Sequence, residues 1–531
     1  MMSTTQEKND LTKVESIDKG TAEHHGHLTF LARAAATEHA LTPLQAMRTH
    51  WRAFMWCLFM CIGALLWGYD AQVGGGLLSV PQFRMDFGYV SDGQPILPAS
   101  WQSAFNSVSS IGGMFGGLSL GWISDRLGRR GAVALASVVS IIGVLIQFLT
   151  PKHVNAMLLV GKLINGVALG LFVSCAGAYC AEVSPLALRG ITTAGVNLWI
   201  VLGQFMSNGV IRGTGTRTDI YAYRLPFALQ WIFPVILLIG LPFAPESPWW
   251  LVRKGRYEEA EKVLLHLGGP TIDAKLQRQQ IQETIELEDS YAVSATYVDC
   301  FRGENLKRTV VAMMVFVLQQ AAGVVFVLGF STYFFELAGF ANNNAFNLGV
   351  GVTAIGVVGN LLTFYTVNRF GRRFLFNWGM VACTIILLLI GFIWIGNANQ
   401  NAKWAVSAFT IIYNFVYQIS IGPLGYVIFA EISSAKLRSK TVGIGIWTNS
   451  LCGLIANIVI PYLVNPDEAN LGGYVGFIFG GLAFAGTIWA YFFIPETKGR
   501  TVDELDLLYE KQVPARHFGT YRLYDGDGEK I

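Results

Sequence analysis

Asp70 is the side chain whose surroundings in the sequence point most directly to chemistry. It is the one charged residue of the stretch 53–79, which is long and apolar enough to cross a membrane as a helix. An ionised carboxylate at that depth is costly unless a cation pairs with it or water reaches it, so such residues usually have a function. No histidine lies within any expected span, which excludes a histidine relay. We therefore predict a functional ionisable group at Asp70.

Two amides, Asn197 and Gln204, form a second candidate group. They stand seven positions apart in the apolar stretch 191–211 and so share one face of a helix. Amide side chains offer both donors and acceptors, which suit a ligand with many hydroxyl groups. Buried amides also hold membrane helices to one another. From the residues alone, ligand binding and helix–helix contact both stay open for this pair.

The composition indicates which solvent surrounds these residues. Of the 531 residues, 53% are hydrophobic and only 14% are charged, with a mean hydropathy of +0.44. A soluble protein cannot bury that much apolar surface. The net charge of +3 is too small to indicate nucleic-acid binding. The seven cysteines form no CxxC pair or cysteine–histidine pattern, so we expect no bound metal, no cofactor and no disulfide framework. The sequence also contains no nucleophile–base pattern of the kind enzymes use, so we do not expect an enzyme.

The elements that position these residues are predicted membrane helices. Each crossing needs about 20 mostly apolar residues. The windows that meet this are 53–79, 99–123, 131–149, 154–181, 191–211, 226–244, 308–334, 345–367, 374–396, 403–430, 440–464 and 472–494. The sequence therefore predicts an all-α membrane protein with 12 transmembrane helices.

Polar stretches divide these helices into parts. We expect a disordered tail at 1–50, a six-helix half at 51–245, a helical linker at 246–307, a second six-helix half at 308–494 and a tail at 495–531. Basic residues collect in the loops at 124–130, 368–373 and 436–440 and in the linker. By the positive-inside rule these segments, and with them both termini, are expected to be cytoplasmic.

The chain also repeats itself at one spacing. AEVSPLALRG, which contains Glu182, returns as AEISSAKLRSK around Glu431, 249 positions later. SDRLGRR returns as VNRFGRR after 243 positions, and PES at 245 returns as PET after 250. These pairs indicate the duplication of a six-helix unit. Two parallel halves with a site between them are a known transporter plan.

Several motifs give this plan a family resemblance. GWISDRLGRR at 121–130 is similar to the loop motif of the major facilitator superfamily. GYDAQVGGG, AEVSPLALRG, PESPWWLVRKGR, GPLGY and PETKGRTVDEL, in that order, resemble the sugar porter family. The likeness covers about 60–505. AYCAEVSPLALRG, YAYRLPFALQW, FAPESPWWLVRKGR and VPARHF are similar to the fungal α-glucoside (maltose-type) permeases, whereas GYDAQVGGGLLSVP is closer to the fungal hexose carriers.

The resemblance assigns roles to single residues. In proton-coupled sugar porters the aspartate of this motif takes up the proton, helped by an arginine early in helix 4, where this chain has Lys162. We expect Asp70 to take up the proton and Lys162 to pair with it while it is ionised. The alternative is that the two residues form a permanent structural ion pair with no part in proton coupling. The expected sugar contacts are Asn197, Gln204, Gln319, Gln320, Tyr417, Tyr426 and Asn449. Val325 and Gly329 stand where the family has Asn and Tyr, which leaves room for a larger substrate such as a disaccharide.

The same resemblance implies a cytoplasmic gate of charged residues. Its expected members are Asp125, Arg129, Arg130, Glu182, Arg189, Glu246, Arg369, Arg372, Arg373, Glu431, Arg438 and Glu496. These charges would pair in one conformation and separate in another. The second copy has Asn368 in place of the aspartate, so we expect its latch to be weaker.

These observations together predict a sugar importer of the major facilitator fold that works by alternating access. We expect sugar:proton symport of an α-glucoside disaccharide or a hexose. The open alternatives are a facilitative uniporter and a non-transporting sugar receptor. The expected partners are the sugar, the proton and the lipid bilayer around a functional monomer, and the resemblance implies the plasma membrane.

Overall fold

The computed structural model describes residues 43–91, 94–269, 273–294, 296–395, 400–434, 437–498, 500 and 502–521. The predicted tail at 1–50 therefore lies almost wholly outside the described residues. The first half of the bundle contains α2 (Pro43–Thr49), α3 (Trp51–Met60), α4 (Ile62–Gly76), α5 (Pro81–Phe87), α6 (Ala99–Leu149), α7 (Asn155–Val183), α8 (Leu186–Thr214), α9 (Tyr221–Ala228) and α10 (Ile232–Gly240). The 3₁₀ segments η1 (Leu77–Ser79) and η2 (Leu229–Trp231) extend α4 and join α9 to α10.

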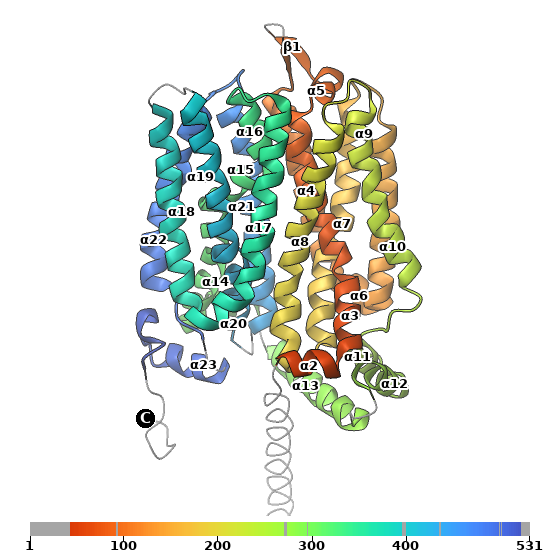
Figure 1. Ribbon diagram of the computed structural model, residues 1–531. Helices are drawn as coiled ribbons and strands as arrows, with labels where there is room; N and C mark the ends of the chain where they lie inside the picture. Colours follow the sequence, from red (N-terminus) through yellow and green to blue (C-terminus); the bar gives the residue numbers. More distant parts are fainter. Residues whose placement is uncertain are drawn as a thin grey trace, which may run out of the picture.

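The second half repeats this arrangement beside the first (Figure 1). Its helices are α14 (Gly303–Ala321), α15 (Val324–Gly329), α16 (Ser331–Leu337), α17 (Asn342–Phe370), α18 (Arg372–Ile395), α19 (Gln400–Ile419), α20 (Ile421–Ile432), α21 (Arg438–Val464) and α22 (Val475–Phe493), the last preceded by η5 (Gly472–Tyr474). After α22 follow α23 (Val502–Glu510) and η6 (Ala515–His517).

Twelve membrane crossings follow from these helices. Ten helices of the described chain are long and apolar enough to span a bilayer. One of them, α6, is really two crossings, because Gly128 has φ 79° and ψ 177° and turns the chain back between them. The remaining crossing is α14–α16, which Gly323 (φ 83°) and Phe330 interrupt. The fold is thus all-α, with two pseudo-symmetric six-helix halves.

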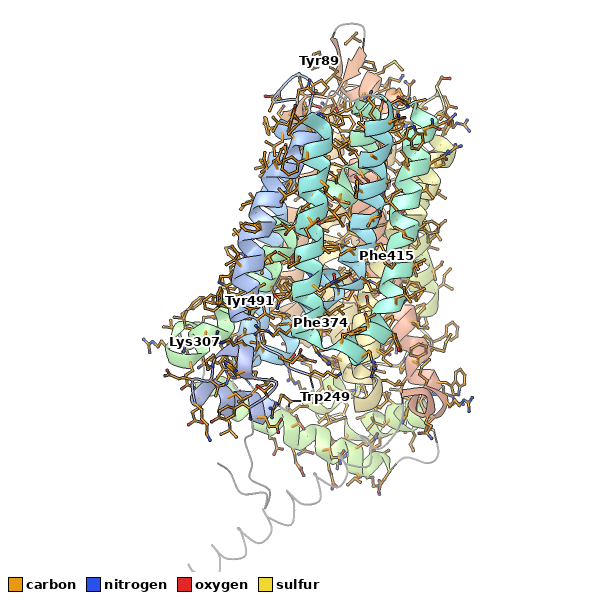
Figure 2. All side chains as sticks on the ribbon, turned by 60° about the vertical axis from the view of Figure 1, so that its left-hand side comes forward. Tyr89, Trp249, Lys307, Phe374, Phe415 and Tyr491 are labelled. Carbon is orange, nitrogen blue, oxygen red and sulfur yellow. The ribbon has the colours of Figure 1, made fainter. Side chains whose placement is uncertain are left out.

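The two ends of the bundle differ in what covers them. At one end lie the linker helices α11 (Pro248–Arg253), α12 (Tyr257–Gly268) and α13 (Ala274–Ser294), followed by η3 (Tyr297–Phe301) (Figure 1). We call this the linker end; α2 and α23 lie there too. At the opposite end, the hairpin end, β1 (Tyr89–Ser91) pairs antiparallel with β2 (Gln94–Ile96) next to α5. In Figure 2, Tyr89 marks the hairpin end and Trp249 the linker end.

The outer surface of the bundle is strongly apolar. Large side chains such as Phe243, Tyr365, Phe392 and Phe484 are more than half exposed. A surface of this kind is unfavourable in water and favourable in lipid. The continuous helices also satisfy their own backbone hydrogen bonds, as a bilayer requires.

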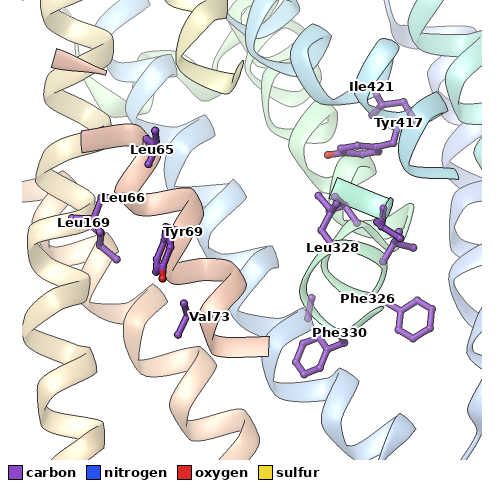
Figure 3. Packing of buried hydrophobic residues seen from close by; sticks show 14 of the residues in the cluster. Leu65, Leu66, Tyr69, Val73, Leu169, Phe326, Leu328, Phe330, Tyr417 and Ile421 are labelled. Carbon is purple, nitrogen blue, oxygen red and sulfur yellow. The ribbon is translucent and has the colours of Figure 1, made fainter. Parts of the chain in front are cut away.

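Buried apolar residues of the two halves lie on opposite sides of the centre in Figure 3. Tyr69 and Val73 of α4 mark one side, and Tyr417, Leu328 and Phe330 mark the other. Toward the hairpin end the halves touch closely, because a Cβ at Gly75 would lie 1.7 Å from the carbonyl oxygen of Gly329. The backbones of α4 and α15 can approach this far only because small residues stand at the contact.

Candidate functional site

Asp70 is buried in α4, with 2% of its surface exposed. Its two oxygens accept hydrogen bonds from neutral groups on two neighbouring helices. The Oγ of Ser109 donates to Oδ2 at 3.0 Å, and the Nδ2 of Asn165 donates to Oδ1 at 3.1 Å. These donors replace part of the hydration that the carboxylate loses by burial.

Lys162 lies in α7 and is 3% exposed. The structure describes both residues and shows no ion pair between Lys162 and Asp70 in this conformation, so the pair stays a prediction for another state of the protein. Lys162 Nζ instead lies next to Gly74, 3.6 Å from where a Cβ would stand. Gly74 follows Asp70 by one helical turn, about 5.4 Å along α4. The absence of a side chain at Gly74 makes room for Oδ1 of Asn106, which would lie 2.4 Å from a Cβ there, and the ammonium group of Lys162 lies beside the same position.

Asn165 connects Asp70 to a wider polar network. Its Nδ2 also donates to Oε1 of Gln230 at 3.1 Å, and its Oδ1 accepts from the Oγ of Ser140 at 2.8 Å. Asn165, Gln230 and Ser140 are all fully buried. The sequence prediction missed this group, although single polar residues within apolar spans were a visible signal.

The expected amide side chains of the second half form hydrogen bonds that connect one helix to another. Nε2 of Gln319 donates to the carbonyl oxygens of Ile421 and Gly422, both at 2.9 Å. These carbonyls stand just after Ser420, where α19 gives way to α20. Nε2 of Gln320 donates to Oδ1 of Asn449 in α21 at 2.9 Å. Gln319 thus ties α14 to α20, and Gln320 and Asn449 lie together.

Three of the expected sugar contacts carry buried polar atoms without a partner. These atoms are Nδ2 of Asn197, Oε1 of Gln204 and Oε1 of Gln320. Buried polar atoms are nearly always hydrogen-bonded, so each unpaired one needs an explanation. A hydroxyl-rich ligand would supply the missing partners. Nδ2 of Asn106, which the sequence prediction did not include, is in the same situation.

The two expected aromatic residues differ in exposure. Tyr417 is buried, and its ring stacks on Tyr413 with centroids 6.2 Å apart. Tyr426 is 41% exposed, and its ring meets Phe316 edge-on at 5.4 Å. Tyr426 is therefore the more accessible of the two.

At the linker end, Glu246 caps the start of the third crossing. It accepts hydrogen bonds from the backbone N–H groups of Arg129 (2.9 Å) and Arg130 (3.3 Å). Its carboxylate fills the place of a Cβ at Gly128, since such an atom would lie 2.3 Å from Oε2. Burial raises the pKa of Glu246, and the backbone hydrogen bonds from Ser247, Arg129 and Arg130 act in the opposite direction.

Arg129 completes this cluster through its side chain. Nη2 forms an ion pair with Oε1 of Glu182 at 2.6 Å, and Ser247 donates to the other oxygen of Glu182. Arg130 reaches back to the carbonyl oxygen of Pro242 at 3.3 Å. We call Gly128, Arg129, Arg130, Glu182, Glu246 and Ser247 the first cluster. All its members belong to the first half or to the start of the linker.

The second half contains the matching arrangement. Glu496 accepts from the backbone N–H groups of Arg372 (2.9 Å) and Arg373 (3.2 Å), and it fills the place of a Cβ at Gly371. Nη2 of Arg372 pairs with Oε1 of Glu431 at 3.0 Å, and Thr497 donates to the other oxygen of Glu431. Gly371, Arg372, Arg373, Glu431, Glu496 and Thr497 form the second cluster.

Not every expected gate residue joins these clusters. The side chain of Asp125 is exposed and is absent from the first cluster; only its carbonyl oxygen takes part, accepting from Trp250 Nε1 at 3.1 Å. Arg369 is exposed, and its carbonyl oxygen accepts from Lys498 Nζ. The side chains of Arg189 and Arg438 lie outside the described part of the chain.

The hairpin end holds an ion pair that the sequence prediction missed. Arg84 of α5 donates from Nη1 and Nη2 to the two oxygens of Glu336 in α16, at 3.0 and 2.5 Å. The side chains are only 9% and 13% exposed. Arg84 belongs to the first half and Glu336 to the second, so this two-point contact joins the halves. Neither residue lies in a recognised motif, and because they are far apart in the sequence, no local pattern could indicate that they pair.

Asn465 strengthens the same contact. Its Oδ1 accepts from Nε2 of Gln102 and from the hydroxyl of Tyr333, both at 2.6 Å, and its Nδ2 donates to the carbonyl oxygen of Leu97. Deeper in the bundle, Asn208 of α8 donates to the carbonyl oxygen of Gly349 in α17 at 2.9 Å. The hairpin end is therefore closed by polar contacts between the halves.

Known proteins resemble this chain in sequence and in structure. A family model described as sugar (and other) transporter matches residues 56–509. The general alpha-glucoside permease of Saccharomyces cerevisiae is 33% identical over 497 residues, 92% of this chain and 80% of the permease. Maltose permease MAL31 of the same yeast is 30% identical over 500 residues, 92% of this chain and 81% of that protein.

Among solved structures, the xylose transporter XylE from E. coli shares the fold. In a partially occluded inward open conformation it has a TM-score of 0.71 at 22% identity, covering 85% of this chain and 99% of XylE. XylE described as a proton:xylose symporter, bound to 6-bromo-6-deoxy-D-glucose, has a TM-score of 0.70 at 24% identity, covering 86% and 99%. With the family match over most of its length and the relatives named above, the chain belongs to the sugar (and other) transporter family, and it has the major facilitator fold.

Proposed function

We propose that this protein imports a sugar together with a proton by alternating access. The setting of Asp70 carries the proposal. The carboxylate is buried, neutral donors alone hold it, and a buried ammonium group lies one helical turn away without pairing with it. A carboxylate in such a place can be neutralised either by a proton or by an approach of Lys162. Exchange between these two partners would couple proton movement to a change of conformation.

The polar contacts of the hairpin end support the alternating-access part. Arg84–Glu336 and the hydrogen bonds of Asn465 would have to break before a sugar could enter from that side. The two clusters at the linker end brace each half as a unit. Rocking of one half against the other around a fixed site is how such transporters work. We place the Asp70–Lys162 pair in a conformation other than this one.

The substrate we propose is an α-glucoside, with a hexose as the second candidate. The relatives named above are alpha-glucoside and maltose permeases. The unpaired amide atoms of Asn197, Gln204 and Gln320 offer one donor and two acceptors for hydroxyl groups. Val325 and Gly329 provide no polar side chain there, which favours a ligand larger than one ring. We further assign Gln319, Tyr417, Tyr426 and Asn449 to the walls of this site.

The charge distribution supports an orientation. The basic loops at 124–130 and 368–373 lie at the linker end, as do α2 and α23 (Figure 1). By the positive-inside rule we propose that the linker end and both termini are cytoplasmic and the hairpin end is extracellular. We propose the plasma membrane as the location and a monomer in the lipid bilayer as the working unit.

Sugar-driven proton uptake is the direct test of symport. The protein would be expressed in a yeast that lacks its own sugar carriers, and maltose, sucrose, glucose, xylose and cellobiose would be added in turn. We expect the medium to become more alkaline with one or two of these sugars. Uptake of labelled sugar without any change of pH would make the protein a uniporter and Asp70 a structural residue.

Asp70→Asn should abolish sugar accumulation and leave exchange of internal and external sugar partly intact, because the amide cannot carry a proton through the cycle. Asp219→Asn is the control, since Asp219 is an exposed loop carboxylate paired with Arg217. Accumulation at the wild-type level in Asp70→Asn would remove this residue from the coupling.

Gln320→Leu tests the sugar site. Loss of the unpaired Oε1 and of the contact with Asn449 should weaken sugar binding by roughly 1–3 kcal/mol. Gln82→Leu removes another buried amide, one that donates to Asp86 within α5 and has no unpaired buried atom, and should leave affinity unchanged. Equal affinity in Gln320→Leu and the wild type would place the sugar elsewhere.

A further inference from the structure

We propose that Asn165 is a positioning residue that keeps Asp70 able to give up its proton, and that Ser140 fixes the orientation in which Asn165 does so. This inference rests on the proton symport proposed above. It concerns residues that belong to no recognised motif of the sequence.

The hydrogen bonds of Asn165 determine which way its amide points. Its NH₂ group has two protons and faces two acceptors, Oδ1 of Asp70 and Oε1 of Gln230, both at 3.1 Å. Its carbonyl oxygen accepts from the Oγ of Ser140 at 2.8 Å. A flipped amide would turn an oxygen toward two acceptors and an NH₂ group toward the hydroxyl. Asn165 is fully buried, so a flipped amide would leave buried polar groups facing like groups, and the present orientation is preferred.

The two partners of Asp70 therefore respond differently to its protonation. A serine hydroxyl can donate to a carboxylate and, after rotation, accept from a carboxylic acid. Ser109 suits both forms of Asp70 in this way. The NH₂ group of Asn165 can only donate. It consequently stabilises the ionised form and gives less to the protonated one. Asn165 thus favours release of the proton, while Ser109 permits both states.

The other groups near Asp70 leave this task to Asn165 in the present conformation. The titratable groups that the structure places there are Lys162 on α7 and Tyr69 on α4 itself. Lys162 lies a turn away beside Gly74, and the hydroxyl of Tyr69 donates to the carbonyl oxygen of Pro226 at 3.1 Å. From α6 and η2 come the neutral Ser109 and Gln230, and from α8 the backbone of Ile200 lies against Gly68 of α4. Lys162 forms no hydrogen bond or ion pair with Asp70 in this conformation, so Asn165 is the neutral partner of Asp70 that can donate to the carboxylate but cannot accept from the acid.

The test is the external pH at which sugar-driven uptake falls to half. Asn165→Leu removes the donor at similar volume, so the ionised form of Asp70 loses one of its two hydrogen bonds. The alkaline limb of the uptake profile should move upward by about one pH unit, and the maximal rate should fall because release is slower. Ser140→Ala frees the amide to turn and should shift the limb the same way by less. Ser137→Ala is the matched control. Ser137 lies on the same helix and is equally buried, but its hydroxyl bonds only the carbonyl oxygen of Val133 on that helix, so the profile should not move.

The possible outcomes distinguish a failure of the positioning role of Asn165 from a failure of the proposed proton symport. If the wild type couples protons to sugar while Asn165→Leu and Ser140→Ala, both present at the cell surface, keep the wild-type profile, the positioning role is wrong and symport stands. If Asn165→Leu does not reach the surface, the shift in Ser140→Ala relative to Ser137→Ala decides the question. If the wild type moves no protons with any sugar, symport and the positioning role fall together.

Discussion

The hairpin end and the linker end are both rich in charged and polar contacts, but these contacts join different partners. At the hairpin end Arg84–Glu336 and the hydrogen bonds of Asn465 connect one half to the other. At the linker end the ion pairs Arg129–Glu182 and Arg372–Glu431 each lie within one half. Contacts of the first kind must break for the halves to rock, whereas contacts of the second kind can persist. We call the contacts of Arg84 with Glu336 and of Asn465 with Gln102 and Leu97, which hold the halves together, the lock. We call the first and second clusters, each of which stabilises one half, the two braces.

The two braces are themselves nearly identical. Each has a glycine in a left-handed conformation, a glutamate over it, and an arginine paired with a second glutamate. We expected the second copy to be weaker because Asn368 replaces the aspartate. The structure instead places the side chain of Asp125 outside the first cluster. Asp125, which Asn368 replaces in the second half, belongs to neither cluster in this conformation. The two clusters therefore match although the sequence differs at this position.

The largest effect is expected from breaking the lock. Arg84→Leu leaves Glu336 buried without its partner, which typically costs about 3–5 kcal/mol. That cost applies only while the hairpin end is closed, so the population should shift toward a form that is open at the hairpin end. The change can be measured as increased labelling of a cysteine introduced at Ser79, a buried position near the hairpin end whose hydroxyl has no hydrogen-bond partner, in a background without other reactive cysteines.

The double variant Arg84→Leu, Glu336→Leu removes both charges together. It should restore much of the closed population, since no isolated charge is left behind. Labelling in Arg84→Leu that matches the wild type would mean that the ion pair does not hold the halves together.

An intermediate effect is expected from the braces. Arg129→Gln and Arg372→Gln should each lower the stability of the protein by about 1–2 kcal/mol, less than the loss of Arg84, because Ser247 and Thr497 still donate to Glu182 and Glu431. Thermal unfolding in detergent, followed by tryptophan fluorescence, measures both. The two losses should agree. A loss in one variant only would show that the two clusters, despite their matching contacts, do not brace the halves equally.

The smallest effect is expected at Asp125. Asp125→Asn should change stability by less than about 0.5 kcal/mol, because the side chain is exposed and belongs to no cluster. Its transport rate is the informative measurement. A slower rate at unchanged stability and unchanged sugar binding would place the partner of Asp125 in the other conformation. A loss of stability comparable to that of Arg129→Gln would contradict the assignment of Asp125 to the periphery.

Much of this architecture follows from local sequence signals. Hydropathy located the crossings, including 308–334, where the structure has the interrupted series α14–α16. The repeat of SDRLGRR as VNRFGRR anticipated two similar clusters. Asp70 could be singled out because a lone carboxylate in an apolar span is rare. The sequence could not decide which group pairs with Asp70, because the long side chain of Lys162 can reach more than one turn of α4.

The sequence by itself thus determined the twelve crossings, their duplication and the family, because burial in lipid imposes a length and a composition on every helix. Only the tertiary structure decided which groups meet. Ser109 and Asn165, rather than Lys162, hold Asp70 because the rotation and height of α6 and α7 against α4 place them there. Arg84 and Glu336, 252 positions apart, meet only because α5 of one half lies against α16 of the other at the hairpin end. Such pairings depend on packing between helices and on the conformation, and neither is written in the pattern of any one helix.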